Sequence, residues 1–226
     1  MPGPPWNDDD PADAGRIISN VRNLLRAIQS AAGARAPLTT ADLLSWHDTL
    51  YAGCSVPVAG YRGHFRGDAS VLELVDYEVR VGVAPGTASA AVTSSVNRLV
   101  AALNKATAAL DAEIALGTTP NPGQITAVLT LCASAHGEWL RIHPFANGNG
   151  RVGRALVAWI ALRYNLPVFL KVKPRPTGNA YVTAAQTVMT SAPNRDFAML
   201  SVFAQMLNEA LAPWLSGPPG KTPVQP

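Results

Sequence analysis

Residues 143–154 read His143-Pro144-Phe145-Ala146-Asn147-Gly148-Asn149-Gly150-Arg151-Val152-Gly153-Arg154. They join two stretches whose apolar residues recur with helical periodicity. Pro144 disfavours a helical conformation for His143, so the preceding helix must end there. Asn147-Gly148 and Asn149-Gly150 favour turns and tolerate positive φ. The sequence therefore predicts a helix, a glycine-rich turn and a second helix that begins near Asn149.

The turn and the helix after it have the composition of an anion-binding site. Backbone N–H groups of such a turn, at the positive end of a helix, attract phosphate. Arg151 and Arg154 are three residues apart and share one face of the first helical turn, and their guanidinium groups match phosphate oxygens. His143 can accept a proton near neutral pH. The segment thus predicts a polyphosphate site beside a general base.

Two other stretches match part of a known motif but lack the sequence context that the motif requires. Gly148-x-Gly150-x-x-Gly153 matches the dinucleotide-binding fingerprint, but it follows a helix and no acidic residue lies about twenty positions later. His136-x-Glu138 matches the first half of the nucleobase-deaminase motif, but no Pro-Cys-x-x-Cys follows it. Neither class of enzyme is supported.

The segment resembles the Fic motif, His-x-Phe-x-(Asp/Glu)-Gly-Asn-Gly-Arg-x-x-Arg, at every fixed position except Asn147. The resemblance extends over about residues 38–190. Gly60-Tyr61-Arg62 and Val79-Arg80-Val81-Gly82 look like parts of the family's substrate-binding β-hairpin, the flap. Alternation of apolar residues over Tyr77–Val83 independently favours a short strand or hairpin. The resemblance implies a mainly α fold, a Fic-type helical domain with a small β-hairpin flap.

The resemblance implies a protein adenylyltransferase that transfers AMP from ATP to a Ser, Thr or Tyr hydroxyl of a target protein. His143 would be the general base, and Phe145 would hold the loop against the core. Phosphates would be bound by Gly148, Asn149, Gly150, Arg151 and Arg154. A target segment would pair with the flap at Val79, Arg80 and Val81. Such phosphoryl chemistry needs mainly positioning and charge stabilisation.

Asn147 stands where the family usually has an acidic ligand for Mg²⁺ (or Mn²⁺). An amide oxygen can coordinate the ion but brings no negative charge. The resemblance therefore implies activity with looser metal binding. It also leaves open a catalytically idle, Fic-shaped binding module.

The donor also stays open, because Fic relatives transfer UMP, phosphocholine or a terminal phosphate from the same site. The phosphotransferase branch typically has lysine in place of the second motif glycine, and Gly150 argues against it.

Many Fic proteins carry an inhibitory helix, (Ser/Thr)-x-x-x-Glu-(Gly/Asn), whose glutamate pairs with the second motif arginine. The first glutamate in the chain is Glu73, so the helices before it cannot carry the motif. Glu209 has Gln205 where the motif needs Ser or Thr, and Ala210 where it needs Gly or Asn. Glu138 has Ser134 at the first position but is followed by Trp139. The sequence predicts no inhibitory helix in this chain. A separate antitoxin-like protein, or another form of control, would regulate the enzyme.

Composition limits the remaining possibilities. Residues 10–215 are predicted to form a single domain, with a flexible N-terminus (1–9) and a disordered Pro/Gly-rich tail (216–226). The net charge is +3 without a dense basic run, which argues against nucleic-acid binding. No run of about eighteen apolar residues suits a membrane, and the first residues show neither the basic nor the apolar stretch of a signal peptide, so none is expected. A cytoplasmic location is expected, with export as an effector left open. His47, His64 and His136 are expected to be structural.

Overall fold

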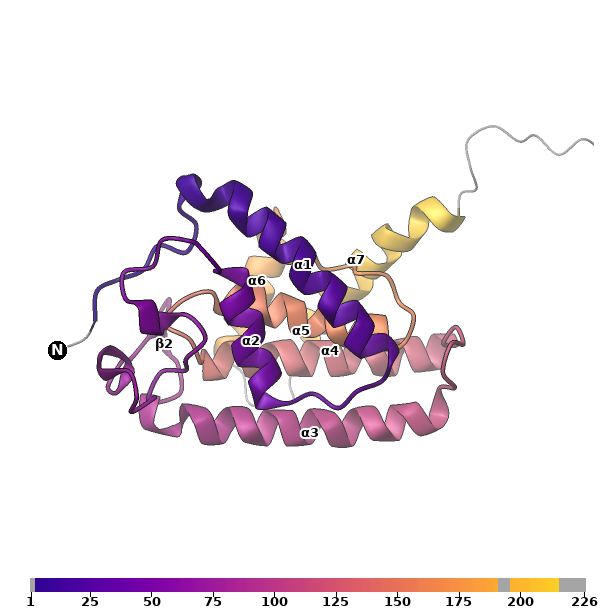
Figure 1. Cartoon of the computed structure of the whole chain (residues 1–226). Helices are drawn as coiled ribbons and strands as arrows, with labels where there is room; N and C mark the ends of the chain where they lie inside the picture. Colours follow the sequence, from indigo (N-terminus) through magenta and orange to yellow (C-terminus); the bar gives the residue numbers. More distant parts are fainter. Residues whose placement is uncertain (1–2, 191–195, 216–226) are drawn as a thin grey trace, which may run out of the picture.

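The computed structural model describes residues 3–190 and 196–215, so the predicted disordered tail (216–226) lies outside the described residues. The described residues form seven α-helices and one small hairpin (Figure 1). The helices are α1 (Ala14–Gly33), α2 (Thr40–Leu50), α3 (Val92–Glu113), α4 (Pro122–Ile142), α5 (Asn149–Arg163), α6 (Asn179–Thr190) and α7 (Phe197–Leu215). The predicted mainly α fold class is confirmed.

Side-chain caps determine where several helices begin. The Asn121 side chain accepts from the Gln124 N–H at 2.9 Å, with Pro122 at the first helical position of α4. The Thr39 side chain accepts from the Asp42 N–H at 3.1 Å and opens α2. Asp10 caps the short 3-10 helix η1 (Pro11–Asp13), which leads into α1. These starts agree with the turn and cap residues in the sequence.

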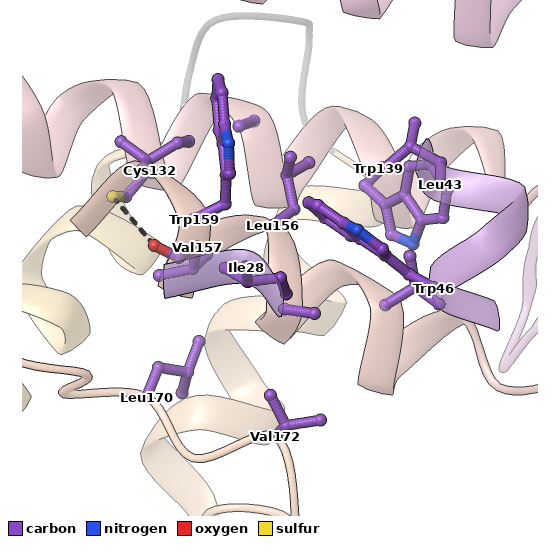
Figure 2. Packing of buried hydrophobic residues seen from close by; sticks show 14 of the residues in the cluster. Ile28, Leu43, Trp46, Cys132, Trp139, Leu156, Val157, Trp159, Leu170 and Val172 are labelled. Carbon is purple, nitrogen blue, oxygen red and sulfur yellow. Dashed lines mark hydrogen bonds between the residues drawn. The ribbon is translucent and has the colours of Figure 1, made fainter. Parts of the chain in front are cut away.

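Helix α5 lies at the centre of the core, against α4 and α1. Almost all of its side chains are buried, among them Leu156 and Trp159. Figure 2 shows these two residues among apolar side chains of neighbouring helices, including Trp139 of α4. A helix enclosed in this way has little room to shift, so its N-terminus is a rigid support for the loop that precedes it.

The hairpin is smaller than the sequence alternation over Tyr77–Val83 suggests. Strands β1 (Arg80–Val81) and β2 (Ala84–Pro85) pair antiparallel, with Val81 opposite Ala84. Gly82 has φ of 61° and allows the two-residue turn between them. The paired residues end at Arg80 and Pro85, and beyond them the Gly86 N–H donates to the Val79 carbonyl at 3.0 Å.

The N-terminal residues lie on the body of the protein. We call Trp6–Asp10 the acidic segment, because Asp8, Asp9 and Asp10 follow one another in it. Residues 1–9 were expected to be flexible, whereas Trp6 is only 7% exposed and packs on Tyr51. Figure 1 shows this segment at the same end of the molecule as β2. In the part of the chain that the structure describes, no helix has the length and hydrophobicity needed to cross a membrane.

Candidate active site

The loop between α4 and α5 begins with a residue in an unusual conformation. His143 has φ of 50° and ψ of 58°, in the left-handed region, which is uncommon for a residue other than glycine. Arg66 holds this turn from across the loop. Its guanidinium donates to the carbonyls of His143 (2.8 Å) and Ile142 (3.1 Å), and its backbone N–H donates to the Pro144 carbonyl (2.8 Å). Charge-assisted bonds of this kind offset the strain of the backbone.

Arg66 also binds the base of the hairpin. The same guanidinium donates to the Tyr77 carbonyl (2.8 Å) and the Thr87 carbonyl (2.7 Å), and Arg66 is fully buried. One side chain therefore connects the loop between α4 and α5 with both ends of the hairpin. Sequence reasoning missed Arg66, because nothing in a single sequence connects it with residues about eighty positions away.

The His143 ring is oriented by the helix before it. Its Nδ1 lies 3.3 Å from the Leu140 carbonyl, so Nδ1–H donates there and Nε2 is the nitrogen that can accept a proton. Burial lowers the pKa of His143 to about 4, with the Leu140 hydrogen bond opposing it and the Arg66 charge adding to it. The ring is therefore neutral at physiological pH, as a general base must be.

Phe145 and Asn149 close the loop from inside. Phe145 is fully buried and stacks on the His47 ring, with centroids 3.8 Å apart. The Asn149 amide accepts from the Phe145 N–H and donates to the Phe145 carbonyl, both at 2.8 Å. Its side chain is thus occupied within the loop, and Asn149 does not line the cavity beside His143 and Arg151. Trp139 donates to the Asn149 carbonyl at 2.9 Å.

His47 supports the same loop and is structural, as expected. Its Nδ1 accepts from the Gly63 N–H (3.0 Å), which leaves Nε2–H to donate to the Asn147 carbonyl (3.1 Å). Burial lowers the pKa of His47 to about 3, so the ring stays neutral. The sequence showed a histidine on a helix but gave no sign that it contacts the loop.

Both motif arginines lie at the start of α5 and are almost fully buried. Arg154 donates twice to the Val172 carbonyl, at 3.0 and 2.8 Å. Arg151 NH1 donates to the Tyr51 hydroxyl oxygen at 2.6 Å. Among the described residues, the buried Nε of Arg151 has no hydrogen-bond partner. A buried donor without a partner is costly in free energy.

Some of the predicted site residues meet at one cavity of about 310 Å³, whose wall does not include Phe145, Asn147, Gly148 or Asn149. Its walls include His143, Gly150, Arg151, Arg154 and, from the hairpin, Val81. The structure therefore brings the proposed base, the start of α5 and one of the predicted flap residues together. The cavity wall does not include the other two predicted flap residues: Val79 accepts from the Gly86 N–H, and Arg80 donates to the Val83 carbonyl. Lys173 and Arg175 also line it, and sequence reasoning did not identify them.

Asn147 offers little to a metal ion. Its amide oxygen accepts from the Gly148 N–H (2.8 Å) and its amide nitrogen donates to the Trp6 carbonyl (2.7 Å). The described residues contain no group of three or more His, Cys, Asp or Glu side chains suited to a metal. The loop thus supplies one neutral oxygen, which fits an ion held mainly by substrate phosphates and not by the protein.

The fold and the cavity define an α-helical domain with a cavity at the start of a buried helix, lined by a histidine and two arginines of one loop and helix start. The sequence model of the Fic/DOC family matches residues 37–161, more than half of the chain, and the chain belongs to this family. A comparison with curated proteins finds no match.

Among solved structures, the chain is similar to a Fic domain containing signaling protein from Bacteroides thetaiotaomicron VPI-5482. The TM-score is 0.60 at 18% identity, over 87% of this chain and 69% of that one. At this identity the likeness establishes the fold.

Replacing Gly148 with alanine is expected to destabilise the protein by roughly 2 kcal/mol or more. Gly148 has φ of 80°, and an added Cβ would lie 2.5 Å from the Tyr51 hydroxyl oxygen. The Tyr51 ring is buried and cannot yield easily. Urea denaturation of the variant would measure the loss. Gly15→Ala in α1 is the matched control: its Cβ would meet nothing within 4 Å, so it should be neutral or slightly stabilising. Equal stability of both variants would contradict this account of the loop.

Proposed function

We propose that this chain is a protein adenylyltransferase that transfers AMP from ATP to a hydroxyl side chain of a target protein. The observation that carries the proposal is a neutral His143, with Nε2 available, on the same cavity as Arg151 and Arg154. Membership in the Fic/DOC family supports a transferase, and the family includes adenylyltransferases.

In the proposed reaction, the hydroxyl oxygen of the target forms a bond to the α-phosphorus of ATP. The bond from that phosphorus to the oxygen shared with the β-phosphate breaks, and pyrophosphate leaves with the electron pair. The hydroxyl proton goes to Nε2 of His143. Arg151 and Arg154 would neutralise charge on the phosphates, and the N–H groups at the start of α5 would add to them.

A divalent cation, Mg²⁺ or Mn²⁺, would assist this charge neutralisation when bound. Asn147 Oδ1 is the loop oxygen that would hold it, and the donor phosphates would supply most of the other ligands. Because Asn147 brings no charge, we expect the cation to bind only together with the nucleotide.

The hairpin is the proposed contact for the target protein. In the described part of the chain it is a sheet of two strands, so one edge of β1 is not paired within it. Val81 lies on the cavity wall and Val83, in the turn, is 83% exposed. An extended target segment that added to β1 would bring its hydroxyl close to His143.

The test is to incubate the purified protein with a cell lysate, Mg²⁺ or Mn²⁺, and ATP labelled at the α or the γ position. Protein labelled from α-labelled ATP alone supports AMP transfer, and label from the γ position would indicate phosphotransfer instead. His143→Ala should lower the labelling rate about a hundredfold or more, since the general base is lost. His64→Ala is the matched control: His64 pairs with Asp68 and does not line the cavity.

Absence of label from ATP would contradict the proposal. Labelling from UTP or CDP-choline would then support another donor on the same site. Asn147 is the one observation that favours a catalytically idle binding module. Absence of labelled protein with every donor would support that function.

A further inference from the structure

The acidic segment covers the side of the cavity where Arg151 lies. The Asp8 carboxylate accepts from Arg151 NH1 and from the Tyr51 hydroxyl, both at 2.8 Å, and the Asp8 carbonyl accepts from the same NH1 at 2.6 Å. The Asp9 carboxylate accepts from Arg151 NH2 at 2.7 Å and also from the Lys173 ammonium group. Two adjacent carboxylates therefore occupy the hydrogen-bonding face of one buried guanidinium.

Lys173 belongs to the same anion-binding site. It comes from the loop after α5, lines the cavity beside Arg151, and shares the Asp9 carboxylate with it. The hydrogen bond from Lys173 is the largest of the causes that lower the pKa of Asp9, with the charges of Arg151 and Arg154 adding to it. An ammonium group in this place suits a phosphate as well as a carboxylate.

The segment is fixed on both sides of these carboxylates. Trp6 packs edge-on against Tyr51, with centroids 4.6 Å apart, and its carbonyl accepts from the Asn147 amide at 2.7 Å. On the other side, Asp10 caps η1, where Pro11 is the first residue. Contacts at both ends hold the carboxylates against Arg151 at a small entropic cost for the residues between them.

We propose that the acidic segment is an internal occupant of the polyphosphate site, with Asp8 and Asp9 on Arg151 and Lys173, and that a polyphosphate must displace it to bind. The inference rests on the proposed function only in taking the donor to be a polyphosphate.

Electrostatics make the displacement possible. A triphosphate carries more negative charge than two carboxylates and has more oxygens for the same cations. The Asp9 side chain is 64% exposed, so its ion pairs are screened by water and can be replaced. The segment has the opposing advantage that it is part of the chain, at an effective concentration of order millimolar. The balance gives a site that is closed in the absence of donor and opens as donor rises.

This contact differs from the inhibitory helix that the sequence lacks. In that helix a glutamate pairs with the second motif arginine, whereas here aspartates bind the first, Arg151. Arg154 donates to the Val172 carbonyl instead. The acidic segment is also not helical, with Asp8 and Asp9 in a turn, and it precedes all of the α-helices.

The test is calorimetric titration of the full chain with inorganic tripolyphosphate. Asp8→Asn/Asp9→Asn should bind it about ten- to a hundredfold more tightly than the unchanged protein. Asp76→Asn/Glu113→Gln is the matched control, since it removes two exposed carboxylates that do not line the cavity. It should bind within about twofold of the unchanged protein, apart from the general effect of net charge. If the two double variants bind alike, the proposal is overturned.

A second variant distinguishes occupation of the site by the acidic segment from the effect of the negative charge of its aspartates. Trp6→Ala keeps both aspartates but removes the aromatic contact that holds the segment, so it should also bind tripolyphosphate more tightly. Its folding can be verified by circular dichroism. If Trp6→Ala binds like the unchanged protein, the effect of the aspartates is charge alone and the proposal fails. It also fails if Lys173→Gln, made in the Asp8→Asn/Asp9→Asn background, does not weaken binding.

The binding readout is independent of AMP transfer. Tighter binding by the segment variants, without any transfer activity, would support the acidic segment and count against the proposed function. Transfer activity with equal binding by all variants would support the function and overturn the role of the segment.

Discussion

Arg66→Met is expected to lower the free energy of unfolding by roughly 3–5 kcal/mol. The Arg66 guanidinium is fully buried and donates to the carbonyls of Tyr77, Thr87, Ile142 and His143. Methionine has a similar volume but no donor, so it would leave these carbonyls, one buried and three partly buried, without this partner. Each such group costs about 1–3 kcal/mol, although the loop can relax and let water reach some of them.

Urea denaturation of the two proteins would measure the difference. Arg62→Met is the matched control, because Arg62 makes one bond to Asp48 and both side chains are more than a third exposed. Its expected loss is below about 1 kcal/mol. Arg66→Lys should recover little, since an ammonium group cannot present the five donors of the guanidinium. A loss as small as that of Arg62→Met would show that Arg66 does not hold the loop.

The architecture around the loop was predictable because its signals are local. Pro144 ends a helix, the Asn-Gly pairs turn the chain, and Asn121 with Pro122 begins α4. Each depends on residues within a few positions of one another, where backbone sterics and capping decide the outcome. The sequence therefore predicted the helix, loop and helix, and the face that Arg151 and Arg154 share.

The support of the loop was not predictable, because it depends on contacts between distant residues. Arg66, His47 and Tyr51 looked like ordinary side chains of other segments, and only the fold brings them to residues 143–151. The acidic segment shows the same limit. Prolines, glycine and aspartates at a terminus are typical of a flexible chain, yet Trp6 has a place in the core. Tertiary packing decided the outcome there against the local composition.

The residue types in the loop did not reveal which side chains hold the loop together and which face the cavity. The motif suggested that Asn149 contacts phosphate, while the structure uses its amide to close the loop on Phe145. Lys173, outside the motif, lies on the cavity instead. A motif gives the residue types that a site needs, but the direction of each side chain follows from its hydrogen-bond partners.

Acidification from pH 7 to 5.5 is expected to lower the free energy of unfolding by roughly 3–4 kcal/mol. The cause is three histidines that the fold keeps neutral, of which His47 and His136 are fully buried and His143 is partly buried. Desolvation lowers the pKa of His47 and His136 to about 3 and that of His143 to about 4, from an ordinary value of 6.5. Below pH 6.5 the unfolded chain therefore binds protons at these positions that the folded protein does not.

The sign follows from this difference. Their contribution to stability is fully present above pH 6.5 and is lost as the pH falls towards 4 and 3. Each histidine adds about 1.4 kcal/mol per pH unit within that window. Most carboxyl groups titrate below about pH 5, so the range from pH 7 to 5.5 reports mainly on the histidines. Urea denaturation at half-unit steps would measure the slope.

His136→Gln isolates one of the three contributions. His136 is fully buried and its Nε2 lies 2.9 Å from the Tyr181 hydroxyl, so the variant should be less stable at every pH. The informative quantity is the slope with pH, which should fall by about one third because one titrating group is gone. A slope unchanged by this variant would mean that the fold does not keep the His136 ring neutral. A stability that does not vary between pH 7 and 5.5 would mean that none of the three rings is kept neutral, and His143 would then lack the neutral state that the proposed general base requires.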